Sequence, residues 1–266
     1  MKRIRIIPTL LIKDQGLVKT TKFKKPFYVG DPINTLKIFN EKEVDELALL
    51  DISEQRAKAP LDIGFIQEIV SEAFMPIAFG GGIQSMTRIE SLLKTGVEKV
   101  VLNSALDRGG DLIQEASAQF GVQSIVASLD VKKGLFGKYG LYVGGGKRRL
   151  KGSVLEWALK LEDQGVGEIL LNSIDRECTY AGFDLELIEL ISEAVDIPVI
   201  ASGGAGELND FRKARLAGAS AAAAGAMFVF QRPNQAVLIT YPSQEALKFI
   251  VSPKIGGTIG LLNQLK

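Results

Sequence analysis

The segment MPIAFGGGI, residues 75–83, returns later in the chain as IPVIASGGAG, residues 197–206, with Pro76 and Pro198 lying 122 positions apart. Each segment combines a short apolar run, which is typical of a buried strand, with glycines that are typical of a turn. A repeat of about 120 residues is too long for the units of a solenoid protein and instead indicates two similar halves.

Two further pairs of segments have nearly the same spacing. ELALLDIS (46–53) matches EILLNSID (168–175), again 122 positions on. TLLIKDQG in the first half matches SLDVKKG in the second half at an offset of 119. In that match Leu11 lies opposite Asp130, so the first half lacks an acid that the second half keeps.

Eight short apolar runs alternate with amphipathic segments along the chain. The expected strands are residues 3–8, 46–52, 75–81, 98–104, 123–130, 167–175, 197–204 and 219–226, with helices between them, for example at 85–96 and 184–195. Continuous apolar strands separated by helices indicate a parallel sheet covered by helices. Eight such units in 266 residues favour a closed (βα)8 barrel of the TIM type over an open doubly wound sheet. We expect one barrel domain over residues 1–266, with half-barrels at about 1–120 and 121–240 and a divergent tail at about 233–266.

Composition excludes several classes of protein and site. Apolar residues make up 46% of the chain and charged residues 24%, which is typical of a globular protein with a large core. A formal net charge of +1 gives no sign of a nucleic-acid partner or of an anionic membrane surface. The sequence has no histidine and a single cysteine, which excludes histidine triads, histidine metal sites and disulfide frameworks. Carboxylates, lysine, tyrosine and Cys178 remain as groups that can transfer protons.

No segment has the pattern of a signal peptide or a membrane span. Lys13 and Asp14 interrupt the apolar run at the N-terminus early. The longest nearly apolar run, residues 217–230, has 14 residues, whereas a span needs roughly 20. We therefore expect a soluble, cytoplasmic protein, and we expect neither a cofactor nor a metal ion.

The repeated glycines suggest two phosphate sites. FGGGI (79–83) and SGGAG (202–206) each follow a strand and precede a helix. At such turns backbone N–H groups can approach a phosphate, and the helix N-terminus favours negative charge. Each turn also lies near the end of the next strand, at LNS (102–104) and AGA (224–226). The pattern predicts a ligand with a phosphate at both ends, although a tight turn alone would also account for the glycines.

Asp130 ends the fifth expected strand, on the face of the barrel that carries active sites. A carboxylate there can act as a general acid or base, whereas an N-cap or a salt bridge to Lys132 or Lys133 would be a purely structural role. Asp51 and Asp175 end the second and sixth strands and are weaker candidates. Two basic stretches, 19–25 and 144–152, would flank the same mouth and attract anions, although such stretches are usually solvated loops.

Four residues of alternating charge open strands of the expected barrel: Arg5, Glu46, Lys99 and Glu168. Parallel strands begin at the same end of a barrel, so these side chains belong at the N-terminal face, away from the mouth. Because buried charges need partners, we expect an ion-paired ring that closes the bottom of the barrel. Alternatively, the four charges only keep the exposed starts of the strands soluble.

Taken together, these residues resemble the cyclase subunit of imidazole glycerol phosphate synthase over roughly residues 3–232. The matching motifs are RIIP (5–8), VGDP (29–32), DEL..LDI (45–52), GGGI (80–83), EKV..N (98–103), GEILLNSIDR (167–176) and IASGGAG (200–206). The resemblance implies a (βα)8 barrel that receives ammonia from a glutaminase subunit docked on its N-terminal face. It also implies that ammonia crosses the barrel to react with a ribulosyl substrate carrying two phosphates.

The resemblance also implies roles for single residues. Arg5, Glu46, Lys99 and Glu168 match the ammonia gate, Gly82, Asn103 and Ser104 one phosphate site, Gly204, Gly225 and Ala226 the other, and Asp130 one of two catalytic aspartates. Lys19, Asp51 and Glu177 complete the expected substrate-binding residues. The second catalytic aspartate falls at Leu11, and an Asp-Gly pair of the family is replaced by Glu177–Cys178.

Three segments, LLIKDQGLVKT, FNEKEVDEL and FVF…AVLITYP, resemble a paralogous branch of that family encoded with surface-polysaccharide genes. That resemblance implies an ATP-dependent sugar amidotransferase as a further partner and a barrel that supplies its ammonia. Two alternatives stay open: a cyclase of histidine biosynthesis that tolerates Leu11, and a non-catalytic scaffold that activates the glutaminase.

Overall fold

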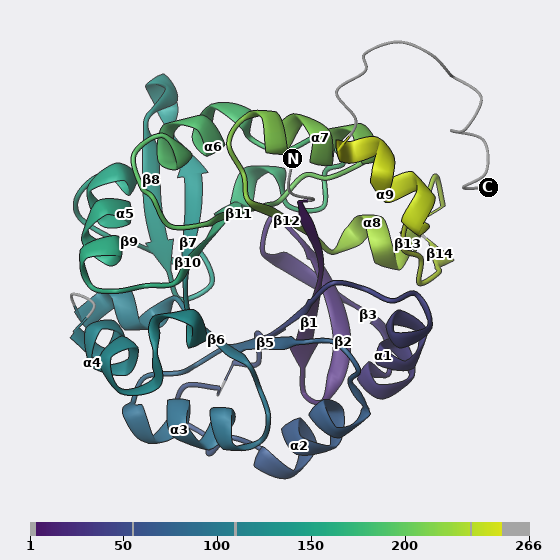
Figure 1. Cartoon of the computed structure of the whole chain (residues 1–266), viewed down its shortest axis with the longest axis horizontal. Helices are drawn as coiled ribbons and strands as arrows, with labels where there is room; N and C mark the ends of the chain where they lie inside the picture. The colour runs from purple at the N-terminus through teal and green to yellow at the C-terminus, as the bar shows by residue number, and fades with distance from the viewer. Residues whose placement is uncertain (1–3, 55, 109–110, 235, 252–266) are drawn as a thin grey trace.

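The computed structural model describes residues 4–54, 56–108, 111–234 and 236–251, and in these ranges eight parallel strands close into a barrel (Figure 1). In order around the barrel they are β1 (Arg5–Lys13), β4 (Leu47–Asp51), β5 (Ile77–Gly80), β6 (Lys99–Leu102), β7 (Ile125–Lys133), β10 (Glu168–Ser173), β11 (Val199–Ser202) and β12 (Ala221–Ala224). Strand β1 pairs in parallel with both β4 and β12, which closes the ring. The expected barrel and its eight strands are confirmed, whereas the division into half-barrels stays a prediction.

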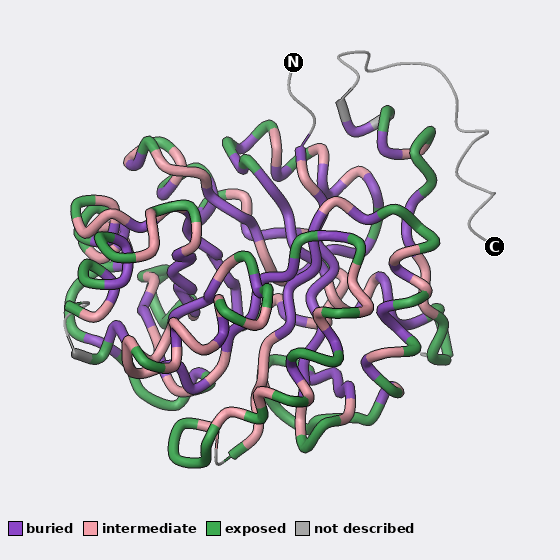
Figure 2. Tube along the Cα trace, turned by 60° about the horizontal axis from the view of Figure 1, so that its bottom comes forward, coloured by how far each residue is buried: buried purple, intermediate pink, exposed green. Residues whose placement is uncertain are grey.

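Helices surround the strands. They are α1 (Pro32–Glu41), α2 (Ile63–Glu72), α3 (Met86–Lys94), α4 (Asp111–Phe120), α5 (Val154–Asp163), α6 (Leu185–Ser192), α7 (Leu208–Leu216), α8 (Ala226–Val229) and α9 (Gln244–Val251). Short polar side chains begin several of them, because such a residue accepts a hydrogen bond from an N–H group of the first turn. Asp31, Ser85 and Ser153 all act in this way. Figure 2 shows buried residues along the central strands and exposed residues on the outer loops. No helix in the described ranges is long and apolar enough to cross a membrane.

The apolar core has two parts, because side chains alternate between the two faces of each strand. One part lies between the strands and the helices. The other fills the barrel interior and consists of Ile7, Ala48, Ala78, Val101, Val126, Leu170, Ile200, Ala221 and Ala223. Four alanines in this inner layer keep the side chains in the narrow lumen small.

Two antiparallel hairpins extend the barrel at its mouth, and sequence reasoning did not predict them as strands. The first hairpin, β2 (Gly16–Thr21) and β3 (Lys24–Gly30), continues β1, with Leu11 paired to Val18. The second, β8 (Tyr139–Val143) and β9 (Arg148–Arg149), continues β7, with Asp130 paired to Tyr142. The basic stretches expected as solvated loops are therefore largely parts of ordered hairpins.

The tail returns to the bottom of the barrel. Strand β13 (Phe230–Gln231) pairs with β14 (Ala236–Val237), and α9 contacts α7. The Tyr241 hydroxyl is buried and donates to the Ile6 carbonyl oxygen over 3.1 Å, beside the start of β1. The rest of the expected tail, residues 252–266, lies outside the described residues.

Candidate functional site

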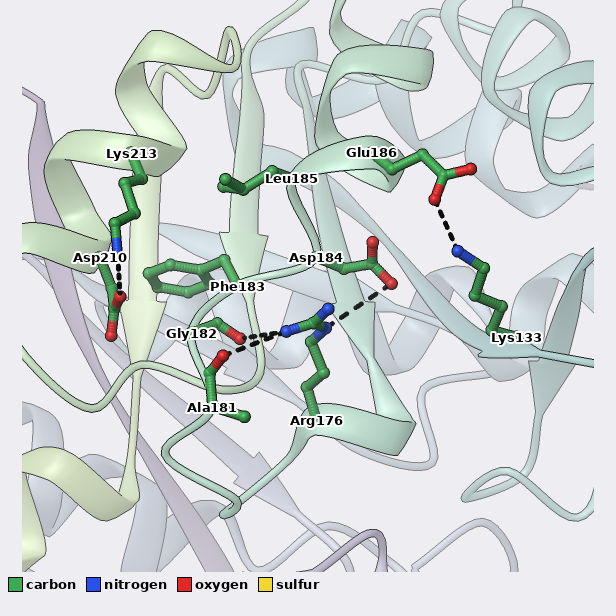
Figure 3. Close-up of a pocket in the computed structure, with 10 residues that line it drawn as sticks. All are labelled: Lys133, Arg176, Ala181, Gly182, Phe183, Asp184, Leu185, Glu186, Asp210 and Lys213. Carbon is green, nitrogen blue, oxygen red and sulfur yellow. Dashed lines mark hydrogen bonds and ion pairs between the residues drawn. The ribbon is translucent and has the colours of Figure 1, made fainter. Parts of the chain in front are cut away.

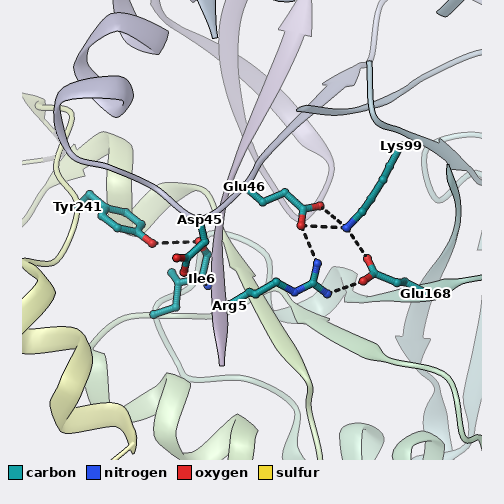
Figure 4. Close-up of polar contacts among 7 residues, drawn as sticks. All are labelled: Arg5, Ile6, Asp45, Glu46, Lys99, Glu168 and Tyr241. Carbon is teal, nitrogen blue, oxygen red and sulfur yellow. Dashed lines mark hydrogen bonds and ion pairs between the residues drawn. The ribbon is translucent and has the colours of Figure 1, made fainter. Parts of the chain in front are cut away.

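The four charged residues at the strand starts form a closed ring (Figure 4). Arg5 donates from Nη1 to Glu46 Oε2 over 2.7 Å and from Nη2 to Glu168 Oε1 over 2.5 Å. Lys99 Nζ lies 3.0 Å from Glu46 Oε2 and 3.1 Å from Glu168 Oε2. Each cation thus contacts both carboxylates. Burial alone would lower the pKa of Arg5, but Glu168 and Glu46 more than offset it and hold that pKa above its ordinary value.

The lumen changes from apolar to polar along its length. Above the charged ring lies the apolar inner layer that contains Ile7 and Leu170. Thr9 and Asn172 stand two residues further along β1 and β10, and Ser128 and Asp130 occupy inward positions on β7. All four of these polar side chains are buried. Ions do not easily cross such an apolar layer, whereas a small neutral molecule can.

Asp130 is the buried acid at the top of the lumen. Its Oδ1 accepts from Ser128 Oγ over 3.4 Å and from Asn172 Nδ2 over 3.3 Å, both long hydrogen bonds. Burial raises the pKa of Asp130 to about 7, and these hydrogen bonds, with Arg56 and Lys132 further away, only partly counteract that rise. A carboxyl group with a pKa near neutrality can both donate and accept a proton.

The structure does not show the salt bridge considered as an alternative role for Asp130. Lys132 Nζ donates to the Gly146 carbonyl oxygen over 2.7 Å, and Lys133 Nζ pairs with Glu186 over 2.6 Å. Leu11 is buried and lies on β1, two residues beyond Thr9. An apolar side chain therefore occupies the inward position of β1 where a second acid was expected.

Backbone geometry requires glycine at both repeated turns. Gly82 has φ +63°, and a Cβ there would lie 2.4 Å from the Arg56 carbonyl oxygen. Gly204 has φ +109°, and a Cβ there would lie 2.1 Å from the Gly182 carbonyl oxygen. The turns thus stand where expected, between β5 and α3 and between β11 and α7, and close packing alone accounts for their glycines.

The residues paired with these turns also lie at the mouth. Asn103 follows β6, and its Nδ2 donates to the carbonyl oxygens of Ser128 and Tyr142. Ser104 begins a 3-10 helix, Ser104–Arg108, and Ala226 begins α8. At Gly225, a Cβ would approach Lys19 Nζ to 2.8 Å, so the lysine covers this turn closely.

Glu177 binds the first hairpin, which lies at the mouth, through an ion pair and two hydrogen bonds. Its Oε1 lies 2.7 Å from Lys19 Nζ and accepts from Thr20 Oγ1 over 3.2 Å, while its Oε2 accepts from the Phe23 backbone N–H over 3.3 Å. Both side chains of the ion pair are almost completely buried, with exposed fractions of 8% for Lys19 and 7% for Glu177. Sequence reasoning assigned both Lys19 and Glu177 to substrate binding, whereas the structure pairs them with each other across 158 positions of the chain.

The two hairpins meet above Asp130. A Cβ at Gly146 would lie 3.3 Å from the Phe23 ring and 3.1 Å from Ile174 Cδ1, so the turn after β8 packs against the tip of the first hairpin. Cys178, where the family has glycine, keeps a left-handed backbone with φ +59°. The two hairpins therefore contact each other at the mouth.

The weaker candidate acids have local structural roles. Asp51 Oδ1 accepts from the Ser53 N–H and Asp175 Oδ2 accepts from the Lys133 N–H, both over 2.8 Å. In the described ranges no group of three or more carboxylate or thiol residues is arranged to hold a metal ion. Sequence reasoning missed Thr9, Ser128 and Asn172, although their even spacing from Ile7, Asp130 and Leu170 places them on the inward face.

Two cavities open at the rim. One, of about 310 Å³, has Lys133 and Glu186 on one side, Asp210 and Lys213 on the other and Arg176 between them (Figure 3). Its cations are all paired with acids of the same wall or with backbone carbonyl groups. The other, of about 320 Å³, lies beside the first hairpin and is lined by Lys19, Thr20, Thr21, Lys25, Phe27, Cys178, Phe230 and Asn234.

Comparison with known proteins agrees with this architecture. The model of a family described as "Histidine biosynthesis protein" matches residues 5–233. A protein of Pseudomonas aeruginosa, provisionally named imidazole glycerol phosphate synthase subunit hisF2, is 50% identical over 93% of this chain and 99% of its own length. A provisionally named subunit hisF3 of Vibrio vulnificus is 44% identical over 93% and 96%. Imidazole glycerol phosphate synthase subunit HisF of Alkaliphilus metalliredigens is 38% identical over 84% and 89%.

Glu177→Gln should loosen the first hairpin, because it leaves the buried Lys19 ammonium without its counter-charge. Removing one partner of a buried ion pair costs about 3 kcal/mol, whereas an exposed pair contributes less than about 1 kcal/mol. We expect that loss of unfolding free energy in urea and several-fold faster trypsin cleavage after Lys22 or Lys24. Glu186→Gln, which breaks the exposed pair with Lys133, is the matched control. Equal cleavage rates in the two variants would contradict the role of Glu177.

Asp130→Asn should change how stability depends on pH. The folded-state pKa of about 7 exceeds the ordinary value of 3.8, so the folded protein binds more protons than the unfolded chain between these values. Wild-type stability therefore falls as pH rises through this window, by on the order of 2 kcal/mol between pH 5 and pH 8. Urea unfolding of Asp130→Asn should lack that decrease, while Asp51→Asn should retain it. A decrease of the same size in all three proteins would show that Asp130 titrates normally.

Proposed function

Because the chain belongs to the histidine biosynthesis protein family, within which it is similar to the HisF subunit of imidazole glycerol phosphate synthase, we propose that it is an ammonia-conducting barrel. It accepts ammonia from a glutaminase subunit at the N-terminal face and delivers it at the mouth. The acceptor is a sugar destined for surface polysaccharide, such as a lipopolysaccharide O-antigen, and an ATP-dependent sugar amidotransferase is the enzyme that consumes the ammonia.

The order of the charged, apolar and polar layers along the lumen is the main support for this proposal. A closed charged ring at the bottom is followed by small apolar side chains and then by buried polar groups near the mouth. Ammonia is small and neutral, so it can pass the apolar layer, and the paired charges can exclude ions and bulk water at the entrance. These layers follow one another along the inside of the barrel, from the charged ring to the mouth.

The leucine at position 11 favours a role in delivering ammonia over a role in the cyclase reaction. A general acid or base must reach the proton that it transfers, and leucine offers no titratable group. Asp130 therefore has no partner acid among the inward residues of β1. The numbered names hisF2 and hisF3 of the relatives fit additional copies that diverged from the histidine-pathway subunit.

Two other functions have support of their own. The cyclase of histidine biosynthesis is favoured by Asp130, by the two glycine turns and by the 38% identity to the HisF subunit of Alkaliphilus metalliredigens. In that case a bis-phosphorylated ligand spans the mouth from Gly82, Asn103 and Ser104 to Gly204, Gly225 and Ala226. A scaffold that only activates the glutaminase needs no continuous lumen, so the buried polar groups above the apolar layer argue against it.

Lys99→Ala should uncouple ammonia delivery while leaving the glutaminase complex assembled. The variant opens one corner of the ring and leaves Glu46 and Glu168 with Arg5 as their shared cation. In the complex of barrel, HisH-type glutaminase and ammonia-consuming enzyme, we expect several-fold more ammonia to escape to solution per glutamine hydrolysed. Lys37→Ala, which breaks an exposed pair with Glu72 on the outside of the barrel, is the control. Unchanged escape from Lys99→Ala, or a wild-type barrel that binds no glutaminase, would refute the conduit.

A further inference from the structure

Asn172 and Asp130 present acceptor atoms to the lumen without matching donors. Ser128 Oγ and Asn172 Nδ2 both donate to the same carboxylate oxygen, Asp130 Oδ1. The other oxygen, Oδ2, accepts no hydrogen bond from any residue in the described ranges. Asn172 Oδ1 is completely buried and likewise has no donor among those residues. A completely buried acceptor such as Asn172 Oδ1 is costly unless a donor molecule binds it, whereas Asp130 Oδ2 is not among the completely buried atoms.

The surroundings of these acceptors favour a ligand that only donates hydrogen bonds. Asn172 and Asp130 are direct neighbours on β10 and β7, so both side chains belong to one part of the lumen wall. Leu11 and Leu50 supply apolar surface on β1 and β4, across the barrel from β7 and β10. Water brings both donors and acceptors, whereas ammonium brings four N–H donors and a positive charge that complements a carboxylate.

We propose that Asp130 and Asn172 form an ammonium-holding site at the top of the lumen, where ammonia that has crossed the apolar layer is protonated and retained. The proton moves from the Asp130 carboxyl group to ammonia: the O–H bond breaks, an N–H bond forms, and an ammonium–carboxylate pair results. When ammonia leaves towards the mouth, the same proton returns to Asp130. Atoms and charge balance without any other reactant.

Such a site retains ammonia at the top of the lumen while it is protonated. Neutral ammonia passes the layer that contains Ile7 and Leu170, but an ammonium ion faces a large desolvation cost if it returns through that layer. The pKa of Asp130, raised by burial to about 7, lies well below that of an ordinary amine, so the transfer runs towards ammonium. Arg56 and Lys132 are the charged groups that act on Asp130, and both weaken rather than prevent cation binding there.

The loss of the first-half acid is consistent with this role. A second carboxylate on β1 would place a like charge opposite Asp130. The pKa of one of the two carboxylates would then be strongly raised. With Leu11 in place, Asp130 is the only carboxylate among the inward residues of the upper lumen described above. The inference rests on the proposed ammonia conduction for the origin of the ligand, but binding itself can be tested with ammonium salts and no glutaminase.

The test is a pH titration of the Asp130 carboxyl carbon by ¹³C NMR, with the resonance assigned from Asp130→Asn. The intact chain is titrated in ammonium chloride and in potassium chloride of equal ionic strength, since potassium has a similar radius but no N–H donors. We expect ammonium to lower the pKa of Asp130 by about one unit relative to potassium, as a close opposite charge does. The same pKa in both salts would overturn the site.

Variants of Asn172 complete the test. Asn172→Leu removes the amide acceptor at similar volume and should abolish most of the ammonium-specific shift, while Asn172→Thr, which keeps a hydroxyl acceptor, should retain part of it. Asn34→Leu, the same change at an exposed position of α1, should leave the shift unchanged. A full shift in Asn172→Leu would remove Asn172 from the site. Because ammonium is added directly, failure here is distinct from failure of glutaminase coupling.

Discussion

Closure of the eight-stranded barrel is the constraint on which the rest of the structure depends. Once β1 pairs with both β4 and β12, every second side chain of each strand points into a lumen that solvent does not fill. The middle of that lumen is therefore apolar and small, and charge is confined to its two ends. At the bottom the charges neutralise one another as a ring, whereas at the top a single buried acid has hydrogen bonds but no ion pair.

The two ends differ in how they can open. The ring at the bottom consists of two cations and two carboxylates, and Lys99 alone already contacts both carboxylates. The hairpin after β1 lies over part of the mouth, held by the buried Lys19–Glu177 pair and by Phe23 against the glycine turn after β8. Opening the mouth must expose that ion pair to solvent, and this lowers the cost of separating its charges.

Sequence predicted the fold and the ring because both follow from local patterns. Strand positions came from apolar runs, and Arg5, Glu46, Lys99 and Glu168 were placed together because parallel strands begin at one end. The Lys19–Glu177 pair could not be predicted in the same way. A lysine in a basic stretch of sequence is normally predicted to be solvated. Only the three-dimensional path of the hairpin brings Lys19 to a carboxylate far away in the chain. Asn172 was missed because an amide within an apolar strand reads as a tolerated exception rather than as part of a site.

The central claim is that this barrel carries ammonia but no longer performs the cyclase reaction of its family, because Leu11 replaces one of two acids. The direct measurement is the steady-state turnover of the bis-phosphorylated ribulosyl substrate of imidazole glycerol phosphate synthase by the purified chain in excess ammonium salt, which bypasses any glutaminase. The account predicts no turnover above the uncatalysed background. Turnover near one per second, within the ordinary range of enzymes, would show that Asp130 suffices and would contradict the account.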